Sequence, residues 1–394
     1  MSAAEAARIL GVNVRSLYAY ASRGKLTSIP SGSGRRRLYA RGDLERLKAN
    51  SDARSGHAAV AAGALSFGEP VLSSAITSIS SRGPLYRGHA AVALADAEAG
   101  FERVAELLWT GALPTERPHF GAPSLGGRPC AGAPLDVFAR LLPELAAADM
   151  ARFDAPDAKE HARARRIVRR FAAALGHARA ALAADTIAEA VLVALGVRVT
   201  RARGALVDRT LVVCADHELN ASTFAARVAA SAGADLYACV TAALATLSGP
   251  RHGGASARLE ALLDEVGTPA RVAAVLSARL RRGEEIPGFG HPLYRSGDPR
   301  GRALLDAARR LSRPHRRLAT VLALVKELER REYPPPNLDA GLCAVAAALG
   351  LAPGTPSALF AIGRTAGWVA HALEQRSTGR LLRPRARYVG VPPV

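Results

Sequence analysis

The sequence predicts a mainly α-helical protein with a small separate module at its N-terminus. Strands that alternate apolar and polar residues are almost absent, and Ala, Leu and Val recur in helical segments through residues 135–206. The stretch 51–65 is small and nearly featureless, as expected of a linker, and the composition changes from Val71 onward. A chain of 394 residues is long enough for about two or three domains.

The formal net charge is +19. Of the 53 basic residues, all are arginine except Lys25, Lys48, Lys159 and Lys326, which indicates a compositional bias toward arginine rather than a polyanion partner for the whole chain. The charge is locally dense only in residues 1–55, where 11 basic and 4 acidic residues contribute +7 of the total. Some of the basic residues outside 1–55 are expected to serve small anionic substrates, because basic clefts attract and hold anions.

The remaining bulk features predict a cytoplasmic protein. No apolar run reaches the ~20 residues that span a membrane, and the N-terminus is polar, without the apolar core of a signal peptide. Four cysteines, Cys130, Cys214, Cys239 and Cys343, are scattered without metal-ligand or disulfide spacing. We therefore expect no metal site and no membrane contact.

The N-terminal module begins with two short helices. Ser2 and Glu5 form a capping box, and Gly11 ends the first helix. Asn13 can cap a second helix over residues 14–23, ended by a glycine. Two short helices joined by a glycine-containing turn predict a helix-turn-helix.

A two-stranded wing is predicted to follow. Residues 26–29 and 37–40 are expected to pair around a loop with a basic tip, and Asp43 is expected to cap a last helix through Leu47. Over residues 1–50 the pattern resembles the winged helix-turn-helix of the MerR/excisionase type. The resemblance implies a DNA contact through three groove-facing and three phosphate-facing side chains, which are Arg15, Ser16, Tyr18, Arg35, Arg36 and Arg37. The alternative is a module used for protein contacts or dimer support.

The middle of the chain predicts mostly helices. Residues 73–81 are a candidate strand or extended segment, 83–89 a turn, and 121–134 a Gly/Pro-rich loop. Helices are expected at 102–109, 135–147, 161–175, 177–183 and 187–195. A short apolar run, 211–215, then leads into Asp216-His-Glu-Leu-Asn220, and a long helix is expected to continue through Leu247.

Three short stretches in the second half place an ionisable residue beside glycine or proline. They are Gly249-Pro-Arg-His252-Gly-Gly, Pro287-Gly-Phe-Gly-His291-Pro and Pro336-Asn-Leu-Asp339-Ala-Gly. Two imidazoles and a carboxylate can supply two hydrogen-bond donors and one base. That set is suited to proton abstraction beside a carbonyl. Taken singly, each residue is more often a cap, a turn or a packed core residue.

These stretches, in this order, resemble the citrate synthase family. Leu85-Tyr-Arg-Gly88 and Asp216-His-Glu-Leu-Asn-Ala-Ser-Thr223 precede them, and Arg364-Thr-Ala-Gly-Trp368 and Arg383-Pro-Arg-Ala-Arg-Tyr388 follow. The resemblance covers residues 66–394. It implies a citrate synthase fold with a large helical domain (66–255 and 345–394), a small one (256–344) and a cleft between them.

The resemblance also implies the roles of the site residues. Asp339 would remove a proton from acetyl-CoA, His252 would hold the enolate oxygen, and His291 would polarise the ketone of oxaloacetate. The oxaloacetate side would be His217, Arg300, Phe360, Arg364 and Arg383, with Arg295 on the phosphates of CoA. In the family the last arginine reaches the partner's site, so a homodimer is expected. The resemblance implies no cofactor beyond the acyl-CoA.

Four neighbours of the catalytic residues depart from the usual family pattern and leave the acyl group open. Ala340 and Gly341 follow Asp339, Pro292 follows His291, and Arg251 precedes His252. Propionyl-CoA, giving 2-methylcitrate, is an alternative substrate, as is another short acyl-CoA or 2-oxoacid. A different alternative is a DNA-binding regulator that uses the citrate synthase-like body as a sensor. A lyase running citryl-CoA chemistry backwards is the third.

Overall fold

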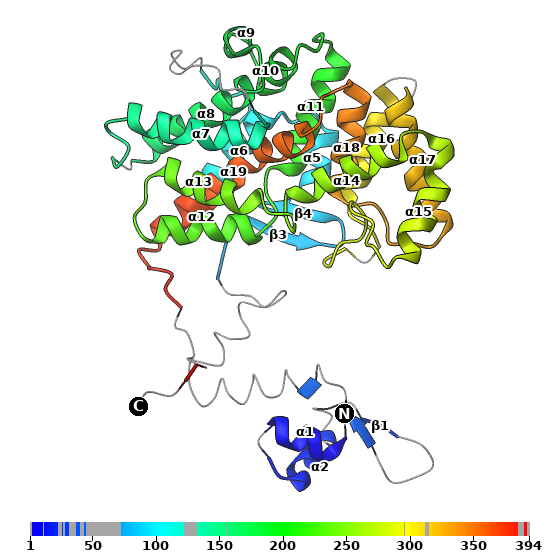
Figure 1. Ribbon diagram of the computed structural model, residues 1–394. Coiled ribbons are helices and arrows are strands. Elements are labelled where there is room, and N and C mark those ends of the chain that lie inside the picture. Colours follow the sequence, from blue (N-terminus) through cyan, green and yellow to red (C-terminus); the bar gives the residue numbers. More distant parts are fainter. Residues whose placement is uncertain are drawn as a thin grey trace. The chain divides into compact units, whose positions relative to one another are not determined.

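The computed structural model of the chain contains two units (Figure 1). It describes residues 2–10, 12–22, 26, 28–30, 37–39, 43–44, 72–121, 132–154, 156–294, 296–311, 315–384 and 390–391. The backbone contacts form two units, Ser74–Leu382 and a second made of Met1–Ser73 with Arg383–Val394. The expected boundaries of the large and small domains stay a prediction.

The N-terminal unit is a small winged helix-turn-helix, as the sequence predicts. Helices α1 (Ala3–Leu10) and α2 (Val14–Ser22) precede the antiparallel strands β1 (Ser28–Pro30) and β2 (Arg37–Tyr39). Among its described residues, six side chains form a buried core, which are Ala6, Ala7, Leu17, Leu26, Tyr39 and Leu44.

The first two of the three predicted helix caps of this unit are present. The backbone N–H of Ser2 donates to the Glu5 carboxylate at 2.9 Å, and the Glu5 N–H donates to Ser2 Oγ at 3.4 Å, which completes the capping box. Asn13 Oδ1 accepts from the Ser16 N–H at 2.8 Å. The predicted linker 51–65 and most of the helix expected after Asp43 lie outside the described residues.

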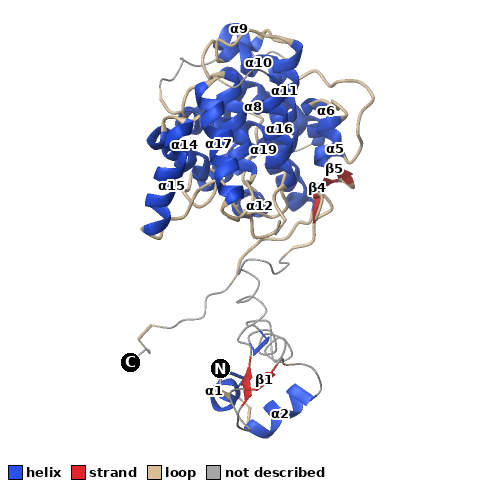
Figure 2. Ribbon diagram, turned by 90° about the vertical axis from the view of Figure 1, so that its right-hand side faces the viewer, coloured by secondary structure: helices blue, strands red, loops and turns tan. Residues whose placement is uncertain are grey.

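The larger unit is mainly helical (Figure 2). Its helices are α5 (Ala91–Asp96), α6 (Phe101–Thr110), α7 (Pro134–Ala148), α8 (Asp157–Ala173), α9 (Ala178–Leu182), α10 (Ile187–Ala194), α11 (Arg201–Cys214), α12 (Ala221–Ser231), α13 (Leu236–Leu247), α14 (Gly254–Val266), the short 3₁₀ helix η1 (Pro269–Arg271), α15 (Val272–Arg281), α16 (Pro299–Leu311), α17 (Arg316–Arg330), α18 (Leu338–Leu349) and α19 (Thr355–Ser377). No helix among the described residues is long and apolar enough to cross a membrane.

Helix α19 is the centre of this unit (Figure 1). It begins after Gly354, which takes a left-handed conformation, and Pro356 occupies its first turn. Every residue from Thr355 to Ala372 is buried, so the helix is enclosed on all sides rather than amphipathic. It packs against α11, α12, α13 and α6, and it therefore holds its polar side chains inside the protein.

A second, smaller core is formed by helices near one end of the unit. Its buried members run from Leu259 to Ala347 and come from α14, α15, α16, α17 and α18, together with Ile286. The main core holds the remaining helices around α19. Helix α18 contributes side chains to both cores, so the residue at its N-terminus lies where the two cores meet.

Two sequence expectations are wrong. The stretch 83–89 is not only a turn, because it forms β4 (Gly83–Tyr86) and β5 (His89–Ala90), which complete an antiparallel sheet with β3 (Thr77–Ser80). The helix expected to continue through Leu247 is two helices, α12 and α13. It breaks because Gly233 has φ +79° and Asp235 Oδ1 caps α13 by accepting from the Ala238 N–H at 2.9 Å.

Candidate active site

Seven of the predicted site residues come from six separate segments of the larger unit. His217 lies between α11 and α12, and His252 in the turn between α13 and α14. His291 lies in the loop before α16, and Asp339 in the first turn of α18. The remaining members are Arg300 on α16, and Phe360 and Arg364 on α19. These positions are helix ends and turns, except for those on the buried helix α19.

Arg300 is a buried cation held by a carboxylate two residues away. Its Nε and Nη2 donate to Asp298 Oδ1 and Oδ2 at 3.0 and 2.8 Å, and only 2 % of Arg300 is exposed. Burial opposes the charge, but the Asp298 carboxylate outweighs burial and raises the pKa of Arg300. The fork is therefore fixed in direction before any ligand binds.

Tyr294 connects three of the predicted site residues. Its hydroxyl lies 2.8 Å from His217 Nε2, and its ring centroid is 4.8 Å from that of His291. The Arg300 guanidinium lies over the ring, 5.6 Å from its centroid. The sequence analysis did not single out this residue, although it lies only three residues after His291. Only 4 % of Tyr294 is exposed. This burial depends on the folded chain and has no local signal in the sequence.

Arg364, Phe360 and His252 form a second group. The Arg364 guanidinium lies 4.7 Å from the centroid of the Phe360 ring, and Arg364 Nε donates to the Cys214 carbonyl at 2.8 Å. The Phe360 and His252 rings meet edge to face with centroids 6.0 Å apart. Burial, and then the Arg364 charge, lower the pKa of His252 to about 4. This imidazole is therefore neutral at pH 7.

His252 is supported by a hydroxyl that the sequence analysis did not single out. Ser222 Oγ lies 2.8 Å from His252 Nε2 and accepts from the Trp368 indole N–H at 3.0 Å. Ser222 lies in the first turn of α12, two residues after the helix cap Asn220, and its hydroxyl donates to Asn220 Oδ1 at 2.8 Å. Because Nε2 of His252 is occupied by the contact with Ser222, Nδ1 is the ring nitrogen left for a ligand.

His291 has its tautomer set by the backbone. The Leu293 N–H donates to His291 Nδ1 at 3.1 Å, so the proton of the neutral ring lies on Nε2. Burial and the Arg300 charge both lower the pKa of His291. At neutral pH the ring is thus a neutral donor through Nε2, which suits it to polarising a carbonyl.

Asp339 is a carboxylate with a raised pKa. Burial raises its pKa to about 6, although the hydrogen bond from Ser256 Oγ, at 2.5 Å, acts in the opposite direction. Asn337 caps α18 and accepts from the Asp339 N–H at 2.9 Å. A carboxylate with a pKa near 6 is a stronger base than an exposed aspartate and is still mostly ionised at pH 7.

The charged and titratable side chains of the site lie close enough to change one another's pKa. Burial lowers the pKa of His217 well below its usual value, and Arg300, Arg364, His291 and His252 lower it further. His217 and His291 also meet edge to face with centroids 5.3 Å apart. The Asp298 carboxylate that holds Arg300 also accepts from the N–H of Leu338, the neighbour of Asp339, at 3.2 Å. The structure therefore brings together His217, His252, His291, Arg300, Asp339, Phe360 and Arg364.

A buried ionic chain lies beneath His217. The preceding residue, Asp216, is fully buried, and its Oδ2 lies 3.3 Å from His371 Nε2. Arg227 lies 3.0 Å from the other nitrogen of His371 and also donates to Glu374 at 2.6 Å. Helices α12 and α19 are thus joined under the site, which fixes the turn that carries His217.

Some predicted residues are not placed in this site. Arg295 lies outside the described residues. Arg383 is exposed and belongs to the unit that includes the N-terminal module, so its role stays a prediction. Of the described side chains, no group of three or more His, Cys, Asp or Glu could hold a metal ion.

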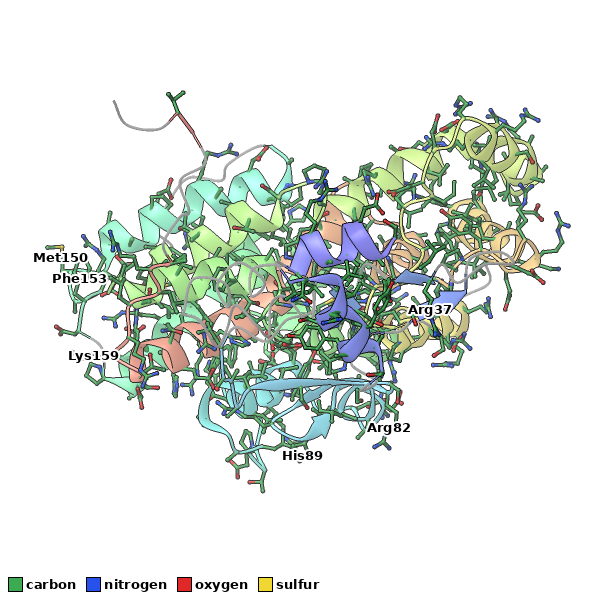
Figure 3. The ribbon with its side chains drawn as sticks, turned by 90° about the horizontal axis from the view of Figure 1, so that it is seen from below. Arg37, Arg82, His89, Met150, Phe153 and Lys159 are labelled. Atoms are coloured by element: carbon green, nitrogen blue, oxygen red, sulfur yellow. The ribbon has the colours of Figure 1, made fainter. Side chains whose placement is uncertain are left out.

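Three of the predicted DNA-contact residues are exposed on the N-terminal unit. Arg15 and Tyr18 are exposed on α2, and Ser16 is half-buried there. Arg37 is exposed on β2, where Figure 3 labels it. Arg35 and Arg36 fall outside the described part of the chain. A basic and an aromatic side chain on one exposed helix are the kind of surface that meets a DNA groove.

Comparisons with known proteins give the same division of the chain. The family described as "Citrate synthase, C-terminal domain" matches residues 66–385, and the family described as "Helix-turn-helix domain" matches residues 1–51. Citrate synthase 2 of Bacillus subtilis is 38% identical over 192 residues, which are 46% of this chain and 50% of that protein. The 2-methylcitrate synthase of Shewanella oneidensis is 37% identical over 194 residues, 48% of this chain and 51% of that protein. The chain thus spans about half the length of these curated relatives.

A solved structure is similar over a longer range. Citrate synthase from Thermoplasma acidophilum, in a ternary complex with carboxymethyl coenzyme A and oxaloacetate, matches with a TM-score of 0.73 and 25% identity. The match covers 84% of this chain and 97% of that one. Together with the family match over residues 66–385, the fold shows that this chain belongs to the citrate synthase family.

Proposed function

We propose that this protein condenses acetyl-CoA with oxaloacetate and releases citrate and CoA. The observation that carries the proposal is the pairing of one basic carboxylate with neutral imidazoles. Asp339 has a pKa raised to about 6, and His252 has a pKa lowered to about 4. A carboxylate base and a neutral donor are what proton removal beside a thioester carbonyl requires.

In the first step Asp339 takes a proton from the methyl group of acetyl-CoA. The electron pair of the C–H bond moves to the thioester oxygen, and His252 donates a hydrogen bond to that oxygen. Because Ser222 occupies Nε2 of His252, the donor would be Nδ1–H. This role requires the Ser222 hydroxyl, which donates to Asn220 Oδ1 at 2.8 Å in this structure, to turn its proton toward Nε2. A neutral imidazole matches the basicity of an enolate better than an imidazolium does.

In the second step the enol carbon attacks the ketone carbon of oxaloacetate. A carbon–carbon bond forms, and the ketone oxygen receives the electron pair and a proton from Nε2 of His291. Water then attacks the thioester carbon of the product, and the carbon–sulfur bond breaks to release CoA. The buried cations Arg300 and Arg364 would hold the carboxylates of the oxoacid, for which a guanidinium fork is better suited than an ammonium.

The direct test is thiol release from acyl-CoA in the presence of oxaloacetate. We expect release with acetyl-CoA that depends on oxaloacetate, and loss of condensation in Asp339→Asn with an unchanged melting temperature. Turnover like that of the wild type in Asp339→Asn would contradict the assignment of the base. A panel of 2-oxoacids beside oxaloacetate shows whether the dicarboxylate is required.

Propionyl-CoA is the second acyl substrate to compare. A relative of similar identity is named a 2-methylcitrate synthase, and the two residues after Asp339 are the small Ala340 and Gly341. A kcat/KM for propionyl-CoA above that for acetyl-CoA would assign the chain to 2-methylcitrate formation. Similar kcat/KM values for the two acyl-CoAs would indicate that the site does not distinguish them by their one-methylene difference. A pocket that does distinguish one methylene gains about 1–3 kcal/mol of transition-state binding from it.

The same proposal includes the assembly and the compartment. A homodimer would bring Arg383 of one subunit to the site of the other, and the reaction needs no cofactor beyond the acyl-CoA. The cytoplasm is the proposed compartment, supported by Cys214, Cys239 and Cys343, which are free and buried, as is usual for thiols in a reducing environment.

A second function, DNA binding, is favoured by the N-terminal unit. Its sequence matches a helix-turn-helix family over residues 1–51, and Arg15, Tyr18 and Arg37 are exposed on it. We would measure binding of the full chain to DNA at several salt concentrations, with Arg15→Ala against the control Arg271→Ala on the larger unit. Weaker binding and a smaller salt slope in Arg15→Ala alone would support a DNA contact. An equal effect of both variants would argue for unspecific attraction to the basic chain.

A further inference from the structure

One side chain, Asn337, joins the loop that carries His291 to the helix that carries Asp339. Its Oδ1 accepts from the Asp339 N–H at 2.9 Å, and its Nδ2 donates to the Gly290 carbonyl at 3.0 Å. The Asn337 backbone N–H also donates to the Gly288 carbonyl at 3.0 Å. The amide can point only one way, because it faces a donor on one side and an acceptor on the other.

The loop that receives these bonds is closely held. The Gly290 N–H donates to the Pro335 carbonyl at 2.7 Å, and Phe289 forms an isolated β-bridge with Pro336. Gly288 and Gly290 have φ of +86° and +78°, which side chains with a Cβ rarely adopt. The loop therefore follows the backbone of residues 335–337, and His291 follows directly after it.

The contact to Gly290 is more than a helix cap requires. A cap needs one acceptor, which Thr200 supplies for α11 and Asp235 supplies for α13 with no amide group. Serine at position 337 would cap α18 about equally well. The NH2 group of the amide donates to the loop that carries His291, so this bond holds the loop and is not needed to cap the helix.

We propose that Asn337 is a positioning residue that sets the place of His291 relative to Asp339. The inference rests on the proposed function, in which Asp339 acts in proton removal and His291 in the attack on the ketone. A catalytic group displaced by about 1 Å can lose on the order of a hundredfold in rate. Loss of the Asn337–Gly290 bond should therefore slow the second step and leave the first.

The two steps can be measured separately in one protein. Proton removal is followed as exchange of the methyl hydrogens of acetyl-CoA with deuterated water, in the presence of malate, which has the two carboxylates but no ketone. Condensation is followed as thiol release with oxaloacetate. In Asn337→Ser the hydroxyl still caps α18 but does not reach Gly290. We expect exchange close to that of the wild type and thiol release lower by about ten- to a hundredfold.

Two further variants separate positioning from stability. Thr200→Ala removes the cap of α11, outside the candidate site, at a cost of about 1 kcal/mol, and should lower the melting temperature without changing either rate. Asn337→Asp has the shape of the wild-type side chain but replaces the donor with an oxygen, so condensation should again fall more than exchange. It provides the same comparison if Asn337→Ser does not fold.

The outcomes distinguish this inference from the proposed function. An equal loss of exchange and condensation in both Asn337 variants, or no loss in either rate, would overturn the positioning role and leave Asn337 as a cap. A wild-type protein without exchange or thiol release would instead contradict the proposed function.

Discussion

At the scale of single residues, the site depends on opposing effects on one carboxyl group. Asp339 lies in the first turn of α18 and accepts a hydrogen bond from Ser256, and both features favour the ionised form. Burial opposes them and prevails, so the pKa rises to about 6. The result is a base whose strength is set by its surroundings and not by its residue type.

The raised pKa predicts an acid limit of activity. Below pH 6 Asp339 is increasingly protonated and cannot accept a proton, so kcat/KM should fall by about tenfold per pH unit. His252, with a pKa of about 4, stays neutral through this range and should not contribute. The measurement is the pH profile of kcat/KM for the acyl-CoA.

A variant of Ser256 tests the cause. The Ser256 hydrogen bond lowers the pKa of Asp339, so Ser256→Ala should move the acid limit to higher pH. Ser377→Ala, which removes an exposed hydroxyl in the last turn of α19, should leave the limit unchanged. A limit that moves to lower pH in Ser256→Ala would contradict the interpretation.

At the scale of elements, close packing of α19 on α11 depends on glycine. The Gly367 N–H donates to the Ala215 carbonyl at 2.9 Å. A Cβ at Gly367 would collide with the Asp216 carboxylate and lie 2.5 Å from the Ala215 carbonyl oxygen. A Cβ at Gly363, one turn earlier, would lie 2.8 Å from Cys214 Cβ. Both contacts support the turn that leads into His217.

We expect Gly367→Ala to destabilise the fold by about 1–3 kcal/mol, because a buried helix contact cannot accept the extra methyl group. The matched control is Gly204→Ala in α11, where a Cβ would meet nothing within 4 Å. That variant should be stabilised by about 0.5–1 kcal/mol, since alanine is the better helix former. Urea unfolding of both variants measures the difference. A more stable Gly367→Ala would contradict the packing argument.

At the scale of the whole molecule, the candidate site joins the two cores of the larger unit. His217, Phe360 and Arg364 come from segments around the main core, and His291 and Asp339 from the loop and helix beside the second core. Helix α18 packs in both cores, so a shift between them would move Asp339 relative to the oxoacid side. The proposed homodimer adds Arg383 from a second copy.

Mixing two inactive variants tests that contribution. Arg383→Ala and Asp339→Asn should each lose activity as homodimers. A hybrid dimer would contain one site with an intact Asp339 and an arginine from the other subunit, so random mixing should restore about a quarter of wild-type activity, as expected for a closed twofold assembly. The measurement is thiol release after the two proteins are unfolded and refolded together. No recovery would mean that Arg383 does not act across the dimer.

The sequence by itself determined the helical class, the helix-turn-helix, the order of the site motifs and many helix limits. Helix α10 and the caps at Ser2 and Asn13 were predictable because a capping contact and an apolar period are local in the chain. The break between α12 and α13 also had local signals, Gly233 and Asp235, but apolar periodicity on both sides obscured them.

Only the tertiary structure decided how the site residues are held. Ser222 meets His252 and Trp368 across 30 and 146 residues of chain, and Tyr294 meets His217 across 77. The pKa of Asp339 likewise depends on burial by several helices. Contacts between distant segments carry no local signal, since the residue types that make them are common everywhere in the sequence. The motifs therefore name the reacting groups, whereas their partners and proton affinities follow from the packing of α11, α12, α18 and α19.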